Sequence, residues 1–321
     1  MRLYRYTLRP LSPWATPLRS DTLYGLLLWR IAERQGDTAC GEAIAAFREG
    51  RPPFVLSSAL PEGQVFAPRL PAAPRALFRQ WVEEGAFHDS SGAPLGLFAA
   101  LQHYKSFRKQ AYLPLSVWQE HASALSVRRL FAWYCARPTT RPEAVTATSV
   151  EHHVSIDRRH NGALEGGLFS DRLQWFAPET RLHLYARTDA PDTLLALLAE
   201  AGDLGFGKDA ALGKGRFAAA LDEDFRPDTL ENGGPSSLLL SVCAAPDMAG
   251  LDGCYTTEIK RGKAWSSLLG PFKNPLLLLR EGSLLHALPH GPFVLDGIHP
   301  DARLVQVTQP LLLPCHMAKE V

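Results

Sequence analysis

The chain has 321 residues, 46% of them hydrophobic, and its formal net charge at pH 7 is +1. This composition predicts a globular protein with one large domain or two modest ones. The five cysteines are scattered without a C-x-x-C pair, which argues against a disulfide framework or a zinc site. Neither a long apolar run nor a signal-peptide pattern is present, so we expect a cytoplasmic protein without a membrane span.

The N-terminal part predicts an α+β unit. Alternating residues at 2–9 favour a strand, and helices are expected at 20–34 and 38–49, each followed by a glycine. Strands at 54–60 and 64–67 can form a hairpin around the Pro-Glu-Gly turn between them. This β-α-β-β order opens a ferredoxin-like fold, the kind that RNA-recognition domains use.

The start of the first helix is a candidate anion site. Ser20 or Asp21 can cap the free backbone amides of the first turn, and Arg19 lies directly before them. Since a helix N-terminus beside an arginine can hold a phosphate, Arg19 and Ser20 are candidate RNA-binding residues.

A basic tract follows at residues 102–141, where seven lysines and arginines accompany only one carboxylate. Lys105, Arg108 and Lys109 lie in a helix expected over 94–111, and a further helix is expected over 115–135. Positive charge interleaved with aromatic rings is typical of a nucleic-acid contact, and the alternative is a solvated helical face. The helical spacing of four apolar residues predicts that they face the core: Phe98, Leu101, Tyr104 and Phe107.

The second half predicts another α+β unit. We place the boundary near Thr146, which gives an N-terminal domain of residues 1–145 and a C-terminal domain of residues 146–321. A strand over 150–157 leads to the turn signal Asn161-Gly162, which puts Arg158 and Arg159 at a hairpin tip. The expected elements that follow are strands at 173–177 and 181–187, a helix at 191–201, a strand at 216–221, and strands at 238–244, 255–260, 276–280 and 304–313.

A glycine-rich loop at residues 202–217 joins that helix to the strand after it. Its glycines permit positive φ, several amides could then point at one anion, and lysine and arginine add charge. Its spacing does not fit a nucleotide P-loop, and its helix-to-strand order differs from that of a dinucleotide-binding loop. We interpret it as an RNA phosphate contact rather than a merely flexible loop, with the candidate residues Gly205, Gly207, Lys208, Gly213, Lys214 and Arg216.

Five short motifs occur in order along nearly the whole chain: Arg19-Ser-Asp-Thr-Leu-Tyr-Gly25, Val154-Ser-Ile-Asp-Arg-Arg159 with Glu165-Gly-Gly-Leu-Phe169, Gly205-Phe-Gly207 followed by Gly213-Lys-Gly-Arg-Phe217, Lys260-Arg-Gly262, and Glu281-Gly-Ser283. Together they resemble the RAMP subunit of type III-A CRISPR effectors that caps the 5′ end of the guide RNA, the fourth subunit of the Csm complex. The chain departs from this pattern at Lys208 and Lys263, where glycine is expected and positive charge stands instead.

The resemblance implies two ferredoxin-like (RRM-like) domains, with the glycine-rich loop before the last strand of the second core unit. It implies a subunit without enzymatic activity of its own. We also expect no cofactor, no small-molecule substrate and no metal, since no second carboxylate lies at a spacing that suggests a metal pair. Its implied partners are the repeat-derived 5′ tag of the guide RNA (crRNA), the large polymerase-type subunit and the adjacent RAMP backbone subunit. The RNA-contacting loop of the family falls on residues 155–169, and His153 beside it is also a candidate.

Two other functions remain open from the residues. A metal-independent guide-processing endoribonuclease could use His152, His153 and His160 as general acid and base, although neighbouring residues of a strand point to opposite faces. Alternatively, the chain is a protein-interaction subunit whose basic tract binds an acidic partner and not RNA.

Overall fold

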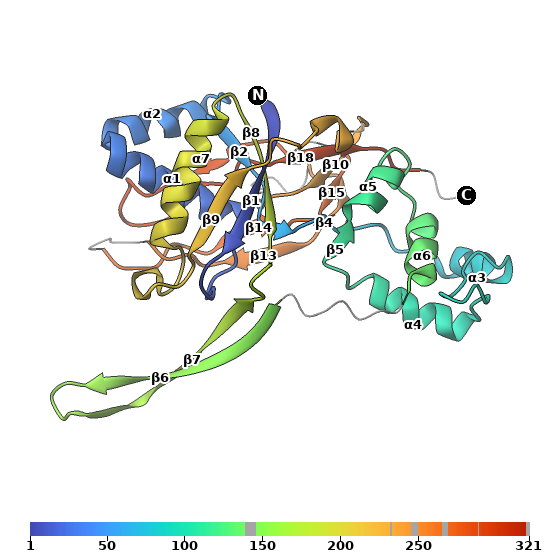
Figure 1. The fold of residues 1–321 in the computed structure, drawn as a ribbon, viewed down its shortest axis with the longest axis horizontal. Helices are drawn as coiled ribbons and strands as arrows, with labels where there is room; N and C mark the ends of the chain where they lie inside the picture. Colours follow the sequence, from blue (N-terminus) through green and yellow to red (C-terminus); the bar gives the residue numbers. More distant parts are fainter. Residues whose placement is uncertain (139–145, 232, 245–249, 265–268, 288, 319–321) are drawn as a thin grey trace.

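A computed structural model describes residues 1–138, 146–231, 233–244, 250–264, 269–287 and 289–318. It has an α+β fold with several antiparallel sheets, as the sequence predicts (Figure 1). Arg141, the last residue of the basic tract, lies outside the described residues.

The main sheet has β1 at its centre. β1 pairs antiparallel with β8 on one side and with β9 on the other, while β2 and β3 both pair with β8. Tyr6 and Leu8 of β1 are buried on one face of the sheet and Leu3 on the other, so both faces of this strand are covered. The strands are β1 (Arg2–Pro10), β2 (Phe54–Leu56), β3 (Leu60–Pro61), β8 (Leu182–Thr188) and β9 (Phe217–Leu221).

Three helices share a core with this sheet. Tyr24 and Leu27 of one helix and Leu198 of another pack with Tyr6 and Leu8 of β1. The expected helices are confirmed to within a few residues: α1 (Ser20–Gln35), α2 (Asp37–Arg48) and α7 (Pro191–Leu204). The two segments β1-α1-β2 and β8-α7-β9 thus form one ferredoxin-like unit with the strand order β2-β8-β1-β9.

The expected domain boundary at 145/146 is therefore wrong. It separates β1 and β2 from β8 and β9, which are neighbours in one sheet. Residues 62–181 are an insertion between strands of that sheet. Local sequence patterns do not predict the pairing of Arg2 with Thr188 across this insertion.

The insertion begins with a helical subdomain, which lies on the opposite side of the molecule from α1 and α2 (Figure 1). Phe78, Trp81 and Phe131 are buried in its core. The expected hairpin at 54–67 is wrong because β4 pairs with β5 and not with β2 or β3. The expected helix at 115–135 is two helices, the second capped by the Ser126 hydroxyl. The elements are β4 (Gln64–Phe66), α3 (Arg75–Glu83), α4 (Leu97–Phe107), β5 (Tyr112–Pro114), α5 (Leu115–His121) and α6 (Val127–Ala136).

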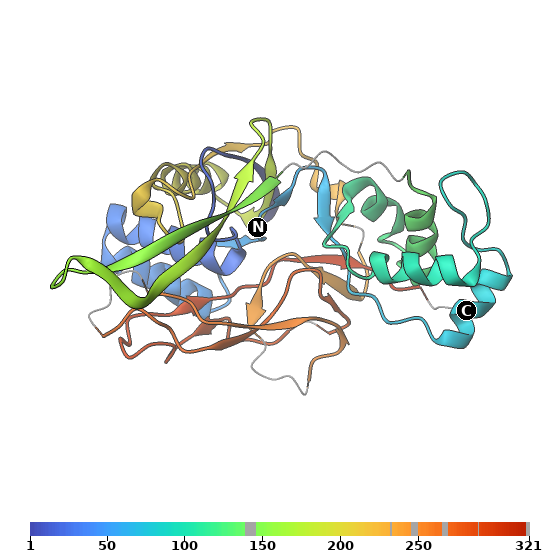
Figure 2. The ribbon, with the colours of Figure 1, turned by 90° about the horizontal axis from the view of Figure 1, so that it is seen from below.

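A long hairpin completes the insertion. β6 (Thr146–Asp157) and β7 (Gly162–Phe176) pair antiparallel and extend away from the rest of the molecule (Figures 1 and 2). Asn161 has φ +54°, which confirms the expected turn at the tip.

The C-terminal part is built from strands. A four-stranded sheet has the order β12-β15-β10-β18, a three-stranded sheet β11-β14-β13, and β16 pairs with β17. The described residues beyond Leu221 form no α-helix. The expectation of a second ferredoxin-like domain with its own helices is therefore not met by these residues. The strands are β10 (Ser236–Leu239), β11 (Cys243–Ala244), β12 (Gly253–Cys254), β13 (Thr257–Lys260), β14 (Leu276–Leu279), β15 (Leu284–Leu285), β16 (Val294–Leu295), β17 (Gln306–Val307) and β18 (Leu312–Cys315), and two 3-10 turns lie at η1 (Ala210–Leu212) and η2 (Pro227–Thr229).

Two helical glycines test the packing of α7 on β9. A Cβ added at Gly202 would lie 2.0 Å from the Phe217 carbonyl oxygen, whereas one added at Gly25 in α1 meets nothing within 4 Å. We expect Gly202→Ala to lower the free energy of unfolding by about 1–3 kcal/mol. Gly25→Ala should raise it by up to about 1 kcal/mol, because alanine loses less entropy in a helix. Denaturant unfolding measures both, and equal effects would contradict the packing.

Candidate nucleic-acid interface

In the structure α7 ends at Leu204 and β9 begins at Phe217, so the connection between them, and from here on the glycine-rich loop, is residues 205–216. Gly207 and Gly215 have φ of +72° and +76°. A Cβ at Gly207 would lie 2.6 Å from the Thr16 side chain, and one at Gly215 would lie 2.2 Å from the Phe206 carbonyl oxygen. The glycines are therefore required by backbone approach within the protein itself.

Most amides of this loop already have protein acceptors. The Gly215 amide donates to the Pro13 carbonyl and the Lys208 amide to Thr16 Oγ1, both at 3.0 Å. The loop amides bonded in this way belong to Gly205, Lys208, Leu212, Gly213, Lys214, Gly215 and Arg216. These seven amides are therefore not free to converge on one anion, as the interpretation of the loop expects.

Trp14, in the segment after β1, contacts both the glycine-rich loop and the hairpin. Trp14 packs edge-on against Phe206 at 4.9 Å and against Phe176 of the hairpin at 4.7 Å. Its backbone exchanges two hydrogen bonds with Gln174 of β7. One buried indole thus joins the glycine-rich loop, β1 and the base of the hairpin.

Both lysines of the loop bind carboxylates on the hairpin. Lys208 Nζ donates to Asp171, and Lys214 Nζ donates to Glu151 at 2.7 Å. The hydrogen bond from Lys208 holds the pKa of Asp171 below its ordinary value, and the bond to Glu151 raises the pKa of Lys214. Lys208 and Lys214, which were expected to bind RNA, thus form ion pairs with carboxylates of the hairpin.

His153 belongs to the same contact. Its ring stacks on Phe169, with 5.2 Å between centroids, and its Nε2 lies 3.4 Å from Asp171. Nε2 is buried and has no hydrogen-bond partner among the described residues. The hairpin face that carries Glu151, His153 and Asp171 therefore packs against the loop, and we define these three residues with Lys208 and Lys214 as the hairpin dock.

The opposite face and the tip of the hairpin are exposed. Val154 and Leu168 form an exposed cross-strand pair. At the tip, Arg158 and Arg159 are exposed, while Asp157 accepts a hydrogen bond from the Arg159 amide at 2.9 Å. The structure leaves these tip arginines accessible: 89% of the Arg159 side chain is exposed, and its Nε lies 3.8 Å from Asp157 Oδ1.

The end of α4 presents a second group of candidates. Lys105, Arg108 and Lys109 are exposed. Tyr104 and Phe107 pack on the core, as expected, but Phe98 and Leu101 lie on the surface with 75% and 42% exposure, so the prediction for those two is wrong. Arg216 is also exposed, although its Nε donates to the Asp203 carbonyl.

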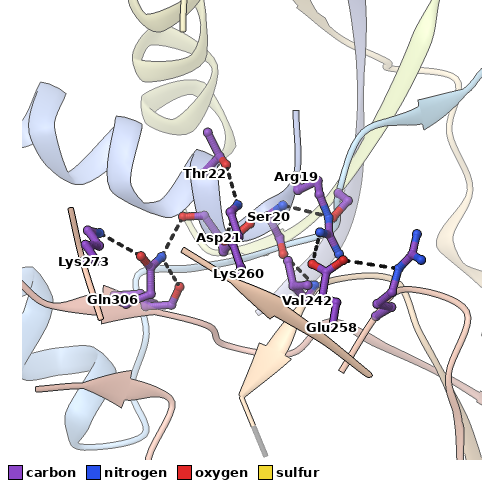
Figure 3. A network of polar contacts seen from close by, with 12 residues as sticks. Arg19, Ser20, Asp21, Thr22, Val242, Glu258, Lys260, Lys273 and Gln306 are labelled. Atoms are coloured by element: carbon purple, nitrogen blue, oxygen red, sulfur yellow. Dashed lines mark hydrogen bonds and ion pairs between the residues drawn. The ribbon is translucent and has the colours of Figure 1, made fainter. Parts of the chain in front are cut away.

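Arg19 and Ser20 lie in a buried polar network instead (Figure 3). Arg19 donates two hydrogen bonds to Glu281, at 2.9 and 2.8 Å, and a further one to Glu258. Ser20 is fully buried, and its hydroxyl accepts from the Val242 amide at 2.8 Å. We therefore remove Arg19 and Ser20 from the candidate RNA-binding residues, because neither is available to a phosphate.

The network joins the start of α1 to the C-terminal sheets. Lys260 Nζ lies 2.6 Å from Asp21 Oδ2, and Lys273 donates to Gln306, which donates to the Asp21 carbonyl (Figure 3). Burial alone would raise the pKa of Glu281, but the bonds from Arg19 outweigh it and hold the pKa below its ordinary 4.5. Three of the five sequence motifs, at residues 19–25, 260–262 and 281–283, thus meet in a structural contact.

The pairs formed by Asp171 and Glu151 with the loop lysines were not expected from the sequence. The acceptors lie on a hairpin that is far away in the chain, and only the β6–β7 register brings Glu151 opposite Asp171.

In the described part of the chain no cluster of three metal-ligating side chains occurs, and no helix there is long and apolar enough to cross a membrane.

Comparison with solved structures relates the whole chain to one fold. The chain matches a chain of the crystal structure of the Csm1-Csm4 cassette in complex with pppApA, with a TM-score of 0.59, 16% identity, and coverage of 99% of this chain and 100% of that one. It also matches a chain of the Csm3-Csm4 subcomplex of the type III-A CRISPR-Cas interference complex, with a TM-score of 0.56, 15% identity, and coverage of 97% and 99%. No protein-family model and no curated protein matches the sequence. The chain therefore shares its fold with subunits of these type III assemblies.

Glu281→Gln tests the buried network. Removing the charge leaves Arg19 buried without its main partner, so we expect the free energy of unfolding to fall by about 3 kcal/mol at pH 7. Because the folded-state pKa of Glu281 is lowered, its contribution is complete above pH 4.5 and is lost as the pH falls below that value. The variant should therefore show a weaker loss of stability below pH 4.5 than the wild type in denaturant titrations.

The matched control for this test is Glu200→Gln, which removes a surface ion pair with Arg34. It should change stability by less than about 1 kcal/mol. Similar losses in the two variants would contradict the role of the buried network.

A charge exchange tests the hairpin dock. Lys208→Glu places a carboxylate against Asp171, so amide hydrogen exchange in the facing part of β6–β7 should become faster. Lys208→Glu combined with Asp171→Lys restores the attraction and should restore slow exchange. Arg159→Glu at the tip serves as the control and should leave exchange at the base unchanged. Unchanged exchange in the Lys208 variant would refute the dock.

Proposed function

We propose that this chain is a non-catalytic, RNA-binding subunit of a type III-A CRISPR ribonucleoprotein in the cytoplasm. In this role it holds the 5′ tag of the crRNA and contacts the large polymerase-type subunit and the adjacent RAMP backbone subunit. The observation that carries the proposal is the likeness in fold, over 99% of the chain, to a chain of the Csm1-Csm4 cassette. A second chain with this fold occurs in the Csm3-Csm4 subcomplex.

The exposed basic groups support RNA binding at particular places. Arg158 and Arg159 project at the end of a hairpin that reaches away from the molecule, and Lys105, Arg108 and Lys109 are exposed at the end of α4. Lys208 and Lys214 have a different task, because their charges are compensated on the hairpin. In the proposed function they position the hairpin, and the arginines of the tip contact phosphate.

The endoribonuclease alternative is not favoured by the histidines. His152 bonds to Ser170 on one face of β6, while His153 lies in the dock on the other face. His160 lies in the turn beyond Asp157, and Asp157, the last residue of β6, is itself about 13 Å along the strand from His153 at the usual rise per residue. General acid and base groups must reach the same reacting bond, and these three side chains are not gathered to do so.

Purification with the native partners, followed by extraction of nucleic acid, tests the proposal. We expect a discrete RNA population with a common 5′ sequence, and the absence of RNA would overturn the proposal. For the isolated full chain, Arg158→Gln combined with Arg159→Gln should reduce the slope of log affinity against log salt by about 0.7 for each phosphate that the tip no longer binds.

The control for the tip variant is Arg34→Gln combined with Arg51→Gln. Both residues are exposed arginines in surface ion pairs, so the same charge is removed from a different part of the molecule. The control should bind RNA as the wild type does. An equal reduction in both double variants would mean that net charge alone, and not the hairpin tip, governs binding.

A further inference from the structure

A hollow lies between the helical subdomain and the C-terminal strands. Its walls come from the connection after β4, the end of α4, and the segment from β12 to β13, and they include Arg69, Arg108, Gly253, Tyr255 and Thr256. We call this the Arg69 hollow. It combines two basic side chains, the exposed ring of Tyr255, and backbone from three segments that are distant in the sequence.

The arginines of this hollow are held by carbonyl groups and not by acids. The Arg69 amide donates to the Gly282 carbonyl at 2.7 Å, and its guanidinium donates to the Arg108 carbonyl at 3.4 Å. Arg108 in turn donates to the carbonyls of Leu70 and Pro71. These bonds fix the direction of both guanidinium groups without neutralising their charge.

The positive charges of Arg69 and Arg108 are therefore not neutralised by a carboxylate among the described residues. Among the ion pairs of the described residues, none involves Arg69 or Arg108. The Arg280 amide donates to the Thr256 carbonyl of the same wall, and its guanidinium forms an ion pair at 3.5 Å with Glu258, a carboxylate that also binds Arg19. Burial lowers the pKa of Arg69, and the nearby charges of Arg280 and Arg108 lower it further.

One donor of the Arg69 side chain also has no acceptor. Arg69 Nε is buried and makes no hydrogen bond to the described residues. A buried N–H of a charged group without a partner is costly, and an anion oxygen would supply the missing acceptor. A guanidinium presents its donors as a planar fork, which matches two oxygens of a phosphate.

We propose that Arg69, Arg108 and Arg280 form a binding site for a phosphate group of the RNA backbone, with the Tyr255 ring beside it as a stacking surface. This inference rests on the proposed function. Lys105 and Lys109 continue the positive charge along α4, and neither is in an ion pair of the described residues. A strip of five basic groups fits a chain of phosphates better than a single carboxylate of an acidic protein.

The test compares variants of the full chain in binding oligouridine RNA over a series of salt concentrations. Arg280→Gln is the principal variant, because this side chain is exposed. We expect about a tenfold weaker affinity and a slope reduced by about 0.7, as for the removal of one charge-assisted hydrogen bond to phosphate. Arg69→Gln combined with Arg280→Gln should reduce the slope by roughly twice as much.

Two controls keep the test specific. Arg280→Lys preserves the charge but not the fork, so the slope should stay near the wild-type value while the affinity falls. Arg34→Gln, a surface change on α1, should leave both quantities unchanged. Thermal unfolding of each variant shows whether weaker binding reflects a smaller fraction of folded protein.

The outcomes separate this inference from the proposed function. If the wild-type chain and its native assembly bind no RNA, the proposed function fails and this inference fails with it. If RNA binds equally to the wild type and to the Arg69 and Arg280 variants with one slope, only the phosphate site is refuted. A variant that binds RNA normally but no longer binds a partner subunit would also refute it, because the cluster would then serve an acidic protein surface.

Discussion

The pairing of β1 with both β8 and β9 is the constraint on which the rest of the structure depends. It joins the first residues of the chain to strands that begin only at Leu182 and Phe217. The segment after β1 carries Trp14, which packs against Phe206 of the glycine-rich loop and against Phe176 at the base of the hairpin. The loop and the hairpin are therefore positioned by the central sheet and not by each other alone.

Two sets of charged contacts have structural tasks in this arrangement. The hairpin dock compensates Lys208 and Lys214 with Asp171 and Glu151, and the buried network compensates Arg19 with Glu258 and Glu281. The charges that remain without a partner of opposite sign are more informative about a ligand, because the protein itself gives them no electrostatic stabilisation. In the described residues they include the α4 lysines and the Arg69 hollow.

Local patterns in the sequence predicted many of the elements. The alternation at residues 2–9, the glycines after α1 and α2, and the Asn161-Gly162 turn all act through neighbouring residues, and the structure confirms them. The domain boundary could not be predicted in this way, because the partners of β1 lie beyond a long insertion. Local patterns could not predict the contacts of the candidate site either. The register of β6 with β7 places the acceptors of Lys208 and Lys214. The charged neighbours of Arg69 likewise come from segments that are distant in the sequence.

The most direct measurement is a cryo-EM structure of the assembly purified with its native partners and RNA. We expect RNA phosphates beside Arg158 and Arg159 at the hairpin tip and in the Arg69 hollow, with Lys208 and Lys214 still bound to Asp171 and Glu151. RNA phosphates bound directly by Lys208, Lys214 and the amides of the glycine-rich loop, with the hairpin dock open, would contradict this expectation.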